Sequence, residues 1–157
     1  MPDIYTHSDL PVDAGTVLAS LTMTGVNTEL WPLVRMTTPR QWSDASILDA
    51  PVQQPLFASW ILLFGWLPVD RHRFRLDRIL PGAGFDENSD SLVNAFWQHS
   101  RRVESVPGGS RVTDTIRYRS RLPLIGHLMR PVYALVFRWR HRRLRTRWGT
   151  LRPEENR

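Results

Sequence analysis

One long hairpin pattern between Asn94 and Arg121 constrains the fold of this chain more than any other feature. Its second half alternates apolar and polar residues almost without a break, and successive side chains of a strand point to opposite faces. One face carries Val112, Asp114, Ile116 and Tyr118, and the other carries arginines and threonines. The turn Pro107-Gly108-Gly109 separates this segment from a first strand at residues 94–103. The pattern therefore predicts two antiparallel strands with one buried face.

Asp114 is the exception on that face, because a carboxylate lies among apolar residues. On the first strand, Trp97, His99 and Arg101 also share one face. If the two buried faces coincide, His99 or Arg101 can meet Asp114 across the sheet. Either pairing would satisfy a buried carboxylate, which is costly to leave without partners.

The rest of the chain supplies further strands, two short helices and one long helix. We expect strands at residues 4–8, 34–38, 71–80, 85–91, 94–103 and 110–119. Short helices are expected at residues 12–21, with Asp9 as cap, and at 27–33, with Asn27 as cap. Residues 41–54 indicate a loop or helical turn, and the apolar run 56–67 is compatible with either a buried strand or a buried helix.

The last helix is predicted over residues 127–148 and has two apolar stripes. The first stripe is Leu128, Val132, Leu135, Val136 and Trp139, and the second is Tyr133, Phe137, Leu144 and Trp148. Because the stripes lie on nearly opposite sides, we expect the sheet to cover one and loops or a partner to cover the other. Residues 150–157 are expected to form a flexible tail after Gly149.

The length of 157 residues fits one domain, which we place at residues 1–149. The chain has no cysteine, which excludes disulfides and a thiolate nucleophile. The start shows no secretory signal pattern, and we therefore expect a cytoplasmic protein. The apolar run from Pro55 to Val69 is too short for a bilayer span, which needs about 20 residues.

The formal net charge of +6 is concentrated near the C-terminus. Arginines crowd this region at positions 138, 140, 142, 143, 145 and 147. Such a basic end suits an anionic membrane surface through Arg138, Arg142, Arg143 and Arg145, with nucleic acid a weaker candidate. The alternative is a solvated helix end without a partner.

The order of elements resembles the helix-grip superfamily SRPBCC, which includes START domains, Bet v 1 relatives and polyketide cyclases. The motifs that carry the resemblance are Trp97-Gln98-His99, Gly108-Gly109, Asp114-Thr115-Ile116-Arg117-Tyr118 and the segment from Leu67 to His72. They are similar to those of an uncharacterised bacterial branch, and the resemblance covers about residues 4–148. It implies an α+β fold in which a curved antiparallel sheet wraps around a long C-terminal helix, with two short helices after the first strand.

The resemblance also implies an apolar cavity between the sheet and the long helix. In such a cavity we expect ligand contacts from residues of the strands and of the helix: His72, Phe74, Glu87, Trp97, Arg101, Ile116, Tyr118, Leu135 and Trp139. The expected ligand is a hydrophobic small molecule of the lipid, polyketide or isoprenoid type.

His99 and Asp114 are the candidate catalytic residues. A carboxylate that accepts from one imidazole nitrogen raises the basicity of the other nitrogen. The alternative is a satisfied buried pair that joins two strands, with Arg101 as an equal candidate partner of Asp114. His127 is interpreted as a helix-start residue and His141 as part of the basic face.

No nucleophile elbow, phosphate-binding loop or nucleotide fingerprint occurs in the sequence. His72, Glu87 and His99 lack close ligand spacing, so neither a metal nor another cofactor is predicted. Two interpretations stay open beside ligand binding: a cyclase, aromatase or hydrolase that uses His99 and Asp114, and a basic protein that binds a membrane or nucleic acid.

Overall fold

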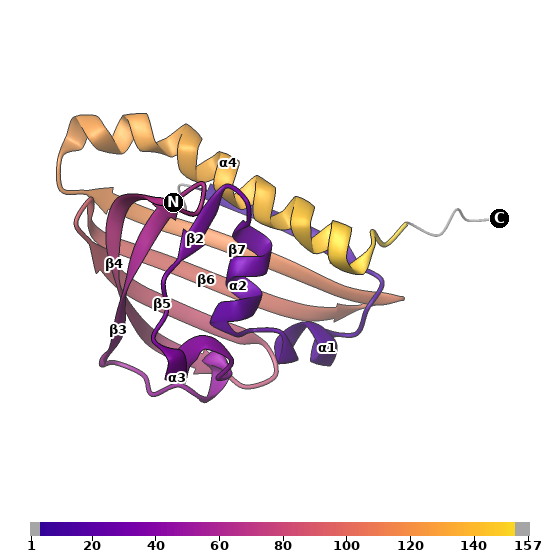
Figure 1. Cartoon of the computed structure of the whole chain (residues 1–157). Helices are drawn as coiled ribbons and strands as arrows, with labels where there is room; N and C mark the ends of the chain where they lie inside the picture. Colours follow the sequence, from indigo (N-terminus) through magenta and orange to yellow (C-terminus); the bar gives the residue numbers. More distant parts are fainter. Residues whose placement is uncertain (1–3, 153–157) are drawn as a thin grey trace.

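The computed structural model describes residues 4–152, which form one curved sheet and a long helix that crosses it (Figure 1). The strands are β1 (Ile4–Leu10), β2 (Val34–Met36), β3 (Pro55–Leu63), β4 (Leu67–Leu80), β5 (Gly84–Ser91), β6 (Asn94–Val106) and β7 (Gly109–Ser120). The helices are α1 (Ala14–Ala19), α2 (Met23–Leu30), α3 (Arg40–Ser43), the short 3-10 helix η1 (Ile47–Asp49) and α4 (Pro123–Trp148).

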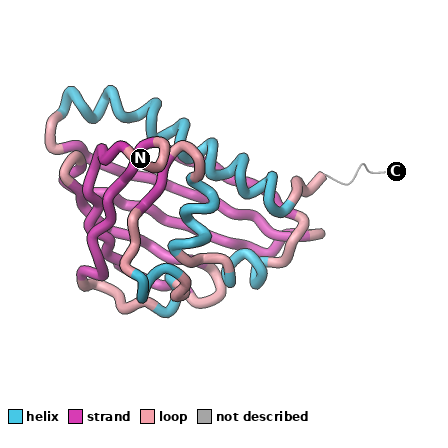
Figure 2. The backbone as a smooth tube through the Cα atoms, in the orientation of Figure 1, coloured by secondary structure: helices cyan, strands magenta, loops and turns pink. Residues whose placement is uncertain are grey.

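The seven strands form a single antiparallel sheet in the order β1-β7-β6-β5-β4-β3-β2. Figure 2 shows that α4 and α2 lie on the same side of this sheet, and Figure 1 shows the sheet curving around that side. β1 is one edge strand of the sheet and pairs with β7 beneath α4. The predicted helix-grip architecture, with two short helices after the first strand, is therefore confirmed.

The predicted hairpin is present as β6 and β7. Arg101 lies directly opposite Asp114, and His99 lies directly opposite Ile116. The turn consists of Pro107 and Gly108, and Gly108 has a φ of +81°, a left-handed conformation that favours glycine. The register therefore places the polar residues of β6 beside the carboxylate of β7, as the alternation indicates.

The short helices begin at other residues than predicted. α1 begins after Asp13, whose side chain accepts from the Thr16 backbone N–H, whereas Asp9 stays in β1. α2 begins after Thr22, whose side chain accepts from the Gly25 backbone N–H. Asn27 is thus inside α2, where its side-chain amide pairs with both backbone groups of Met36. Both caps are short polar side chains, which accept hydrogen bonds well at a helix start. Several such residues precede each helix, so the sequence alone did not identify the one that caps it.

The apolar run 56–67 is a strand, β3, followed by a tight turn into β4. A register shift between Leu76 and Arg78 turns Arg78 to the outer face, where it donates to Asp86. The alternation of inward and outward side chains in β4 is therefore interrupted there by a β-bulge.

α4 begins at Pro123, four residues before the predicted start, and Pro131 lies inside it. Among residues 4–152, no helix is both long enough and apolar enough to cross a bilayer. The predicted tail is partly placed, because the Leu151 backbone N–H donates to the Asp9 carbonyl, and residues 153–157 lie outside the described part. The domain boundary at residue 149 stays a prediction.

The interior contains three apolar clusters between the sheet and the helices. One lies under α1 and α2 around Leu76 and Phe85, one under the C-terminal half of α4 around Leu10, Val112 and Leu144, and one around Ile116 and Phe137. The second and third leave a gap in the apolar packing at Asp114, between Val112 and Ile116. Charged side chains from the sheet and from two helices fill this gap.

Candidate functional site

Asp114 is the centre of a buried charged network. It is fully buried on β7 and receives four hydrogen bonds. Arg101 donates from Nε to Oδ1 at 2.8 Å and from Nη2 to Oδ2 at 2.6 Å, His99 Nε2 donates to Oδ1 at 2.8 Å, and His141 Nε2 donates to Oδ2 at 3.0 Å. A carboxylate has about four acceptor positions, so these donors use its capacity.

The electrostatics of Asp114 follow from this arrangement. Burial alone would raise the pKa of Asp114, but the charge and hydrogen bonds of Arg101 hold it well below its usual range. The two parallel N–H bonds from one guanidinium are the bidentate geometry in which arginine binds carboxylates most strongly. Asp114 is therefore an ionised group with no lone pair directed at free space.

Glu29 extends the network from the sheet to α2 and α4. Arg101 Nη1 donates to Glu29 Oε1 at 2.9 Å, and Arg140 donates to Glu29 Oε2 from Nη2 at 2.8 Å and from Nε at 3.1 Å. Glu29 is buried in the last turn of α2, and Arg140 is buried on α4. Burial would raise the pKa of Glu29, but Arg101 and Arg140 lower it. One carboxylate thus connects three separate elements.

His99 lies between two carboxylates. Its Nε2 donates to Asp114, and its Nδ1 lies 3.4 Å from Glu87 Oε2. Burial would lower the pKa of His99, but Asp114 and Glu87 together raise it above the usual value, which favours the doubly protonated ring. Neither ring nitrogen points away from a carboxylate.

Glu87 on β5 continues the network to β4. His72 Nε2 donates to Glu87 Oε1 at 2.5 Å, and both side chains are buried. Burial would raise the pKa of Glu87, but His72 and His99 lower it to about 2. The predicted site residues His72, Glu87, His99, Arg101 and Asp114 are therefore brought together in one chain of hydrogen bonds and ion pairs.

His141 is also part of this network, and its predicted place on an exposed basic face is wrong. It is buried on α4, and burial lowers its pKa. Its Nε2 donates to Asp114, while Ser8 Oγ lies 2.8 Å from Nδ1 and accepts from Arg145 Nη1 at 2.8 Å. A neutral imidazole with its proton on Nε2 fits these partners, with the Ser8 hydroxyl donating to Nδ1.

An aromatic cluster lies beside the network, under the N-terminal half of α4. The ring of Tyr133 makes edge contacts with Trp97 at 5.0 Å and with Tyr118 at 4.9 Å between centroids. The hydroxyl of Tyr133 accepts from Asn94 Nδ2 at 2.8 Å, and burial raises the pKa of Tyr133 to about 12. The three rings are half-buried, whereas Asn94 is buried and its Oδ1 accepts no hydrogen bond within residues 4–152.

The other predicted ligand residues separate into two groups. Phe74 and Ile116 are buried in apolar clusters of the core. Leu135 and Trp139 are on the opposite side of α4, away from the sheet, and the indole Nε1 of Trp139 donates to the Trp31 carbonyl at 3.1 Å. The structure therefore does not bring Leu135 and Trp139 to the interior with the remaining residues.

The basic end of α4 is divided in a similar way. Arg138 and Arg142 are exposed. Arg143 and Arg145 are half-buried and donate to the Thr28 carbonyl and to Ser8 Oγ. Within residues 4–152, Arg138 and Arg142 are thus the members of the predicted basic surface without such hydrogen bonds to β1 or α2.

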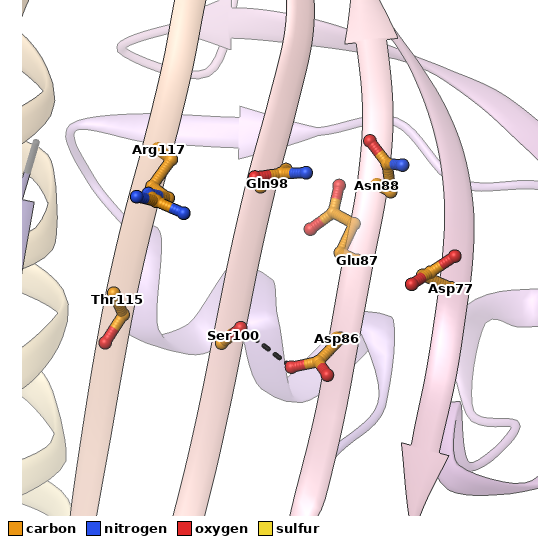
Figure 3. A pocket seen from close by; sticks show the side chains of 8 residues that line it. All are labelled: Asp77, Asp86, Glu87, Asn88, Gln98, Ser100, Thr115 and Arg117. Carbon is orange, nitrogen blue, oxygen red and sulfur yellow. Dashed lines mark hydrogen bonds between the residues drawn. The ribbon is translucent and has the colours of Figure 1, made fainter. Parts of the chain in front are cut away.

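Two surface grooves accompany this interior. The first, of about 480 Å³, lies on strands β4 to β7 and is lined mainly by polar side chains of their outer face (Figure 3). Its central carboxylate, Asp86, accepts from Ser100, Arg78 and Arg102, so its charge is already satisfied. The second groove, of about 450 Å³, lies between β1 and α4 and is lined in part by Tyr5, Arg130 and Arg138. The polar lining makes the first groove a poor host for a hydrophobic molecule.

Sequence reasoning missed Glu29 and Arg140, which complete the network. Glu29 lies 72 positions from Arg101 and 111 from Arg140 along the chain, so no local spacing connects them. The available signal was the acidic residue immediately before Leu30 in an otherwise uncharged helix, whose buried position only the packing of α2 against α4 makes evident.

Solved structures share this fold at low sequence identity. A protein from Chromobacterium violaceum is 12% identical, with a TM-score of 0.67 over 94% of this chain and 97% of its own. Ara h 8.0201 is 11% identical, with a TM-score of 0.52 over 90% and 96%. DynU16, a protein of the dynemicin biosynthetic locus, is 10% identical, with a TM-score of 0.54 over 94% of this chain and 49% of its own.

These likenesses show that the chain has a Bet v 1-like, helix-grip fold. No curated protein matches the sequence. A family model described as "Domain of unknown function (DUF8410)" matches residues 8–148, which include every member of the buried network and the aromatic cluster. The chain therefore belongs to the DUF8410 family.

Proposed function

We propose that this protein binds a hydrophobic small molecule of the lipid, polyketide or isoprenoid type between the sheet and the N-terminal half of α4. The observation that carries this proposal is the half-buried cluster of Trp97, Tyr118 and Tyr133 at that end of the interior. Ligand sites in proteins are mostly apolar and aromatic, with a few placed polar groups. The similarity to Ara h 8.0201 and DynU16 supports a ligand-binding fold.

The buried network limits where such a ligand can lie. Its charged groups fill the middle of the interior and the apolar cluster around Leu144 fills the far end. Displacing ionised groups that are already paired would be costly, whereas half-buried aromatic rings can repack around a guest. The ligand would therefore rest on Trp97 and Tyr133, with the network beneath it.

Asn94 gives this site a polar end. Its Oδ1 is buried without a donor among the described residues, next to the Tyr133 hydroxyl. A buried acceptor without a donor costs free energy, so a ligand with a hydroxyl or amine near that atom would gain a hydrogen bond. This favours a largely apolar molecule with one polar group.

The catalytic alternative has weaker support. An acid–base role for His99 requires a ring nitrogen that reaches the ligand, and both of its nitrogens lie against carboxylates. Asp114 is likewise surrounded by four donors. These contacts fit a satisfied structural group, and they favour binding over turnover.

The proposal is tested with native mass spectrometry of protein purified from its own host, and with the fluorescent probe 1-anilinonaphthalene-8-sulfonate. A co-purifying hydrophobic mass is expected. Trp97→Leu should weaken probe binding about threefold to tenfold, the range of one lost aromatic contact. The matched control is Trp60→Leu, because Trp60 is exposed on β3, outside the aromatic cluster.

Circular dichroism would establish that both variants are folded. Equal probe affinity in the two variants, or the absence of both a bound mass and probe binding, would refute the proposed site.

A further inference from the structure

The outward side of α4 is apolar, although it faces away from the sheet. Exposed fractions are 76% for Leu124, 67% for Leu128, 43% for Val132 and 54% for Leu135. Helices on the surface of a protein normally carry polar residues on that side. Part of the first stripe predicted from the sequence thus has no partner among the described residues.

This stripe continues onto the β3–β4 turn through two tryptophans. Trp139 on α4 donates to the carbonyl of Trp31, whose ring lies against Gly65. A Cβ on Gly65 would lie 2.7 Å from that ring, and Gly65 has a φ of +84°, so glycine is required for this contact. The residues on either side of it, Phe64 and Trp66, are 57% and 71% exposed.

We call this combined area the outer apolar surface. It consists of Trp31, Phe64, Trp66, Leu124, Leu128, Val132, Leu135 and Trp139. Contiguous exposed apolar patches of this kind mark sites of interaction with proteins or membranes.

The charge around the outer apolar surface is positive. α4 contains seven arginines and no acidic residue. Arg138 and Arg142 are exposed next to the stripe, and Arg142 lies over the Trp139 ring at 5.6 Å. Within residues 4–152 neither of them forms an ion pair with a carboxylate, in contrast to Arg140. Arg130 and Arg138 also line the groove beside β1, where a phosphate group would meet two guanidiniums.

We propose that the outer apolar surface docks on an anionic phospholipid bilayer, with Leu128, Leu135 and Trp66 at the acyl boundary and Arg138 and Arg142 at the headgroups. Exposed leucine and tryptophan beside arginine is the composition of helices that lie in the membrane interface. A second copy of this chain is a poor occupant, because a face-to-face pair would place arginine-rich helices together without acidic residues between them. This docking is independent of the ligand site on the inner side of α4.

The experiment is co-sedimentation with vesicles of phosphatidylcholine alone and of phosphatidylcholine with phosphatidylglycerol. We expect binding to the anionic vesicles only, and weaker binding at about 0.5 M salt, where charges are screened within a few ångströms. The double variant Leu128→Ser/Leu135→Ser should bind at least about tenfold more weakly, because two leucines are no longer buried in the bilayer. Its control is Leu92→Ser/Val52→Ser, two exposed apolar residues in loops outside the outer apolar surface.

Charge is tested by Arg138→Glu against Arg75→Glu, since Arg75 is an exposed arginine on β4 and both variants change the net charge equally. Arg138→Glu should weaken vesicle binding about tenfold more than Arg75→Glu. Equal effects of the two charge variants would overturn the proposal, as would unchanged vesicle binding by the leucine variant. The proposal would also be overturned if sedimentation velocity showed that the native protein is a dimer and that the leucine variant is a monomer. Binding of 1-anilinonaphthalene-8-sulfonate in the absence of vesicles tests the ligand site separately. A variant that loses this probe binding, such as Trp97→Leu, should still bind the vesicles.

Discussion

Arg101 and Asp114 lie directly opposite each other on β6 and β7, and Arg101 donates to both carboxylate oxygens at 2.8 and 2.6 Å in a fully buried environment. The same guanidinium also donates to Glu29, so one arginine connects the hairpin to α2. Buried ion pairs stabilise a fold weakly against apolar replacements, but they are costly to break by removing one partner.

Replacing one member of this pair should therefore be severe. We predict that Asp114→Asn lowers the free energy of unfolding by about 3–5 kcal/mol, because Arg101 loses a buried counter-charge. Urea denaturation followed by tryptophan fluorescence measures the change. Asp77→Asn, at an exposed position of β4, is the control and should change stability by less than about 0.5 kcal/mol. A similar loss in the two variants would contradict the assigned role of Asp114.

The contact between α2 and α4 depends on a second pair. Arg140→Met should cost roughly 1.5–3 kcal/mol, since it removes charged hydrogen bonds to Glu29 while the arm of the side chain can still pack. The control is Arg142→Met, at an exposed position of α4 outside this pair. It should leave the free energy of unfolding nearly unchanged. Hydrogen exchange at α2 should increase in Arg140→Met alone. Unchanged exchange at α2 would show that Glu29 is held by Arg101 without help.

Acid should destabilise the protein through Glu87. The pKa of Glu87 is lowered to about 2 from its usual value of 4.5, so the unfolded chain takes up the proton first as the pH falls. The ionised Glu87 therefore contributes roughly 3 kcal/mol to the free energy of unfolding above about pH 5. This contribution is lost as the pH falls towards 2. Glu87→Gln should therefore be less stable than the native protein at pH 6, and the difference should narrow by pH 3.

Glu104→Gln, at an exposed position of β6, is the matched control for this pH series. Its stability should follow that of the native protein at every pH. A constant difference between the native protein and Glu87→Gln from pH 6 to pH 3 would rule out the proposed linkage.

The pKa values of the two central histidines should be shifted in opposite directions from the usual value. The pKa of His99 is raised and that of His141 is lowered, because His99 lies between two carboxylates whereas burial dominates at His141. The stability contributed by His99 is thus complete below its unfolded pKa of about 6.5 and is lost as the pH rises through the folded value. For His141 the contribution is present above about 6.5 and is lost as the pH falls.

Long-range ¹H–¹⁵N correlation spectra of the imidazole rings would measure both. At pH 6 the His99 ring should carry protons on both nitrogens, and at neutral pH His141 should carry one, on Nε2. His7 on the exposed side of β1 serves as the reference signal. A neutral His99 at pH 6 would contradict the arrangement described here.

The two sides of α4 should differ in their contribution to stability. Leu144→Ala should cost about 2–5 kcal/mol, since Leu144 is fully buried against β1 and β7. Leu135→Ala, on the exposed side of the same helix, should change stability by less than about 0.5 kcal/mol. Thermal or urea unfolding of both variants tests this, and a large loss for Leu135→Ala would indicate a partner on the outer side even in the purified protein.

The hairpin illustrates what could be read from the sequence. The alternation from Val112 to Tyr118 predicted both the buried face of β7 and the inward position of Asp114, because strand periodicity is a local property. The sequence allowed His99 or Arg101 to meet Asp114 if the two buried faces coincide, and the register of β6 and β7 shows that they do. Sequence reasoning left these as alternative partners, and the structure shows that both donate to Asp114 at once.

The orientation of α4 could not be predicted from the sequence. Both stripes of α4 were evident, but their periodicity does not say which one meets the sheet. Packing places Phe137 and Leu144 inside and Leu135 outside, so the structure does not bring Leu135 into the interior with the other predicted ligand residues. The same orientation moved His141 from an assumed surface position to the centre of the network.

The amino-acid sequence by itself determined most of the strands, the buried face of each hairpin strand and the long terminal helix, because each depends on patterns a few residues long. Only the tertiary structure decided which carboxylates, guanidiniums and imidazoles share the interior. Glu29, Arg101 and Arg140 come from distant segments, and their meeting depends on how α2 and α4 pack over the sheet. The free energy of that packing is a sum over contacts distant in the chain, which no local pattern encodes.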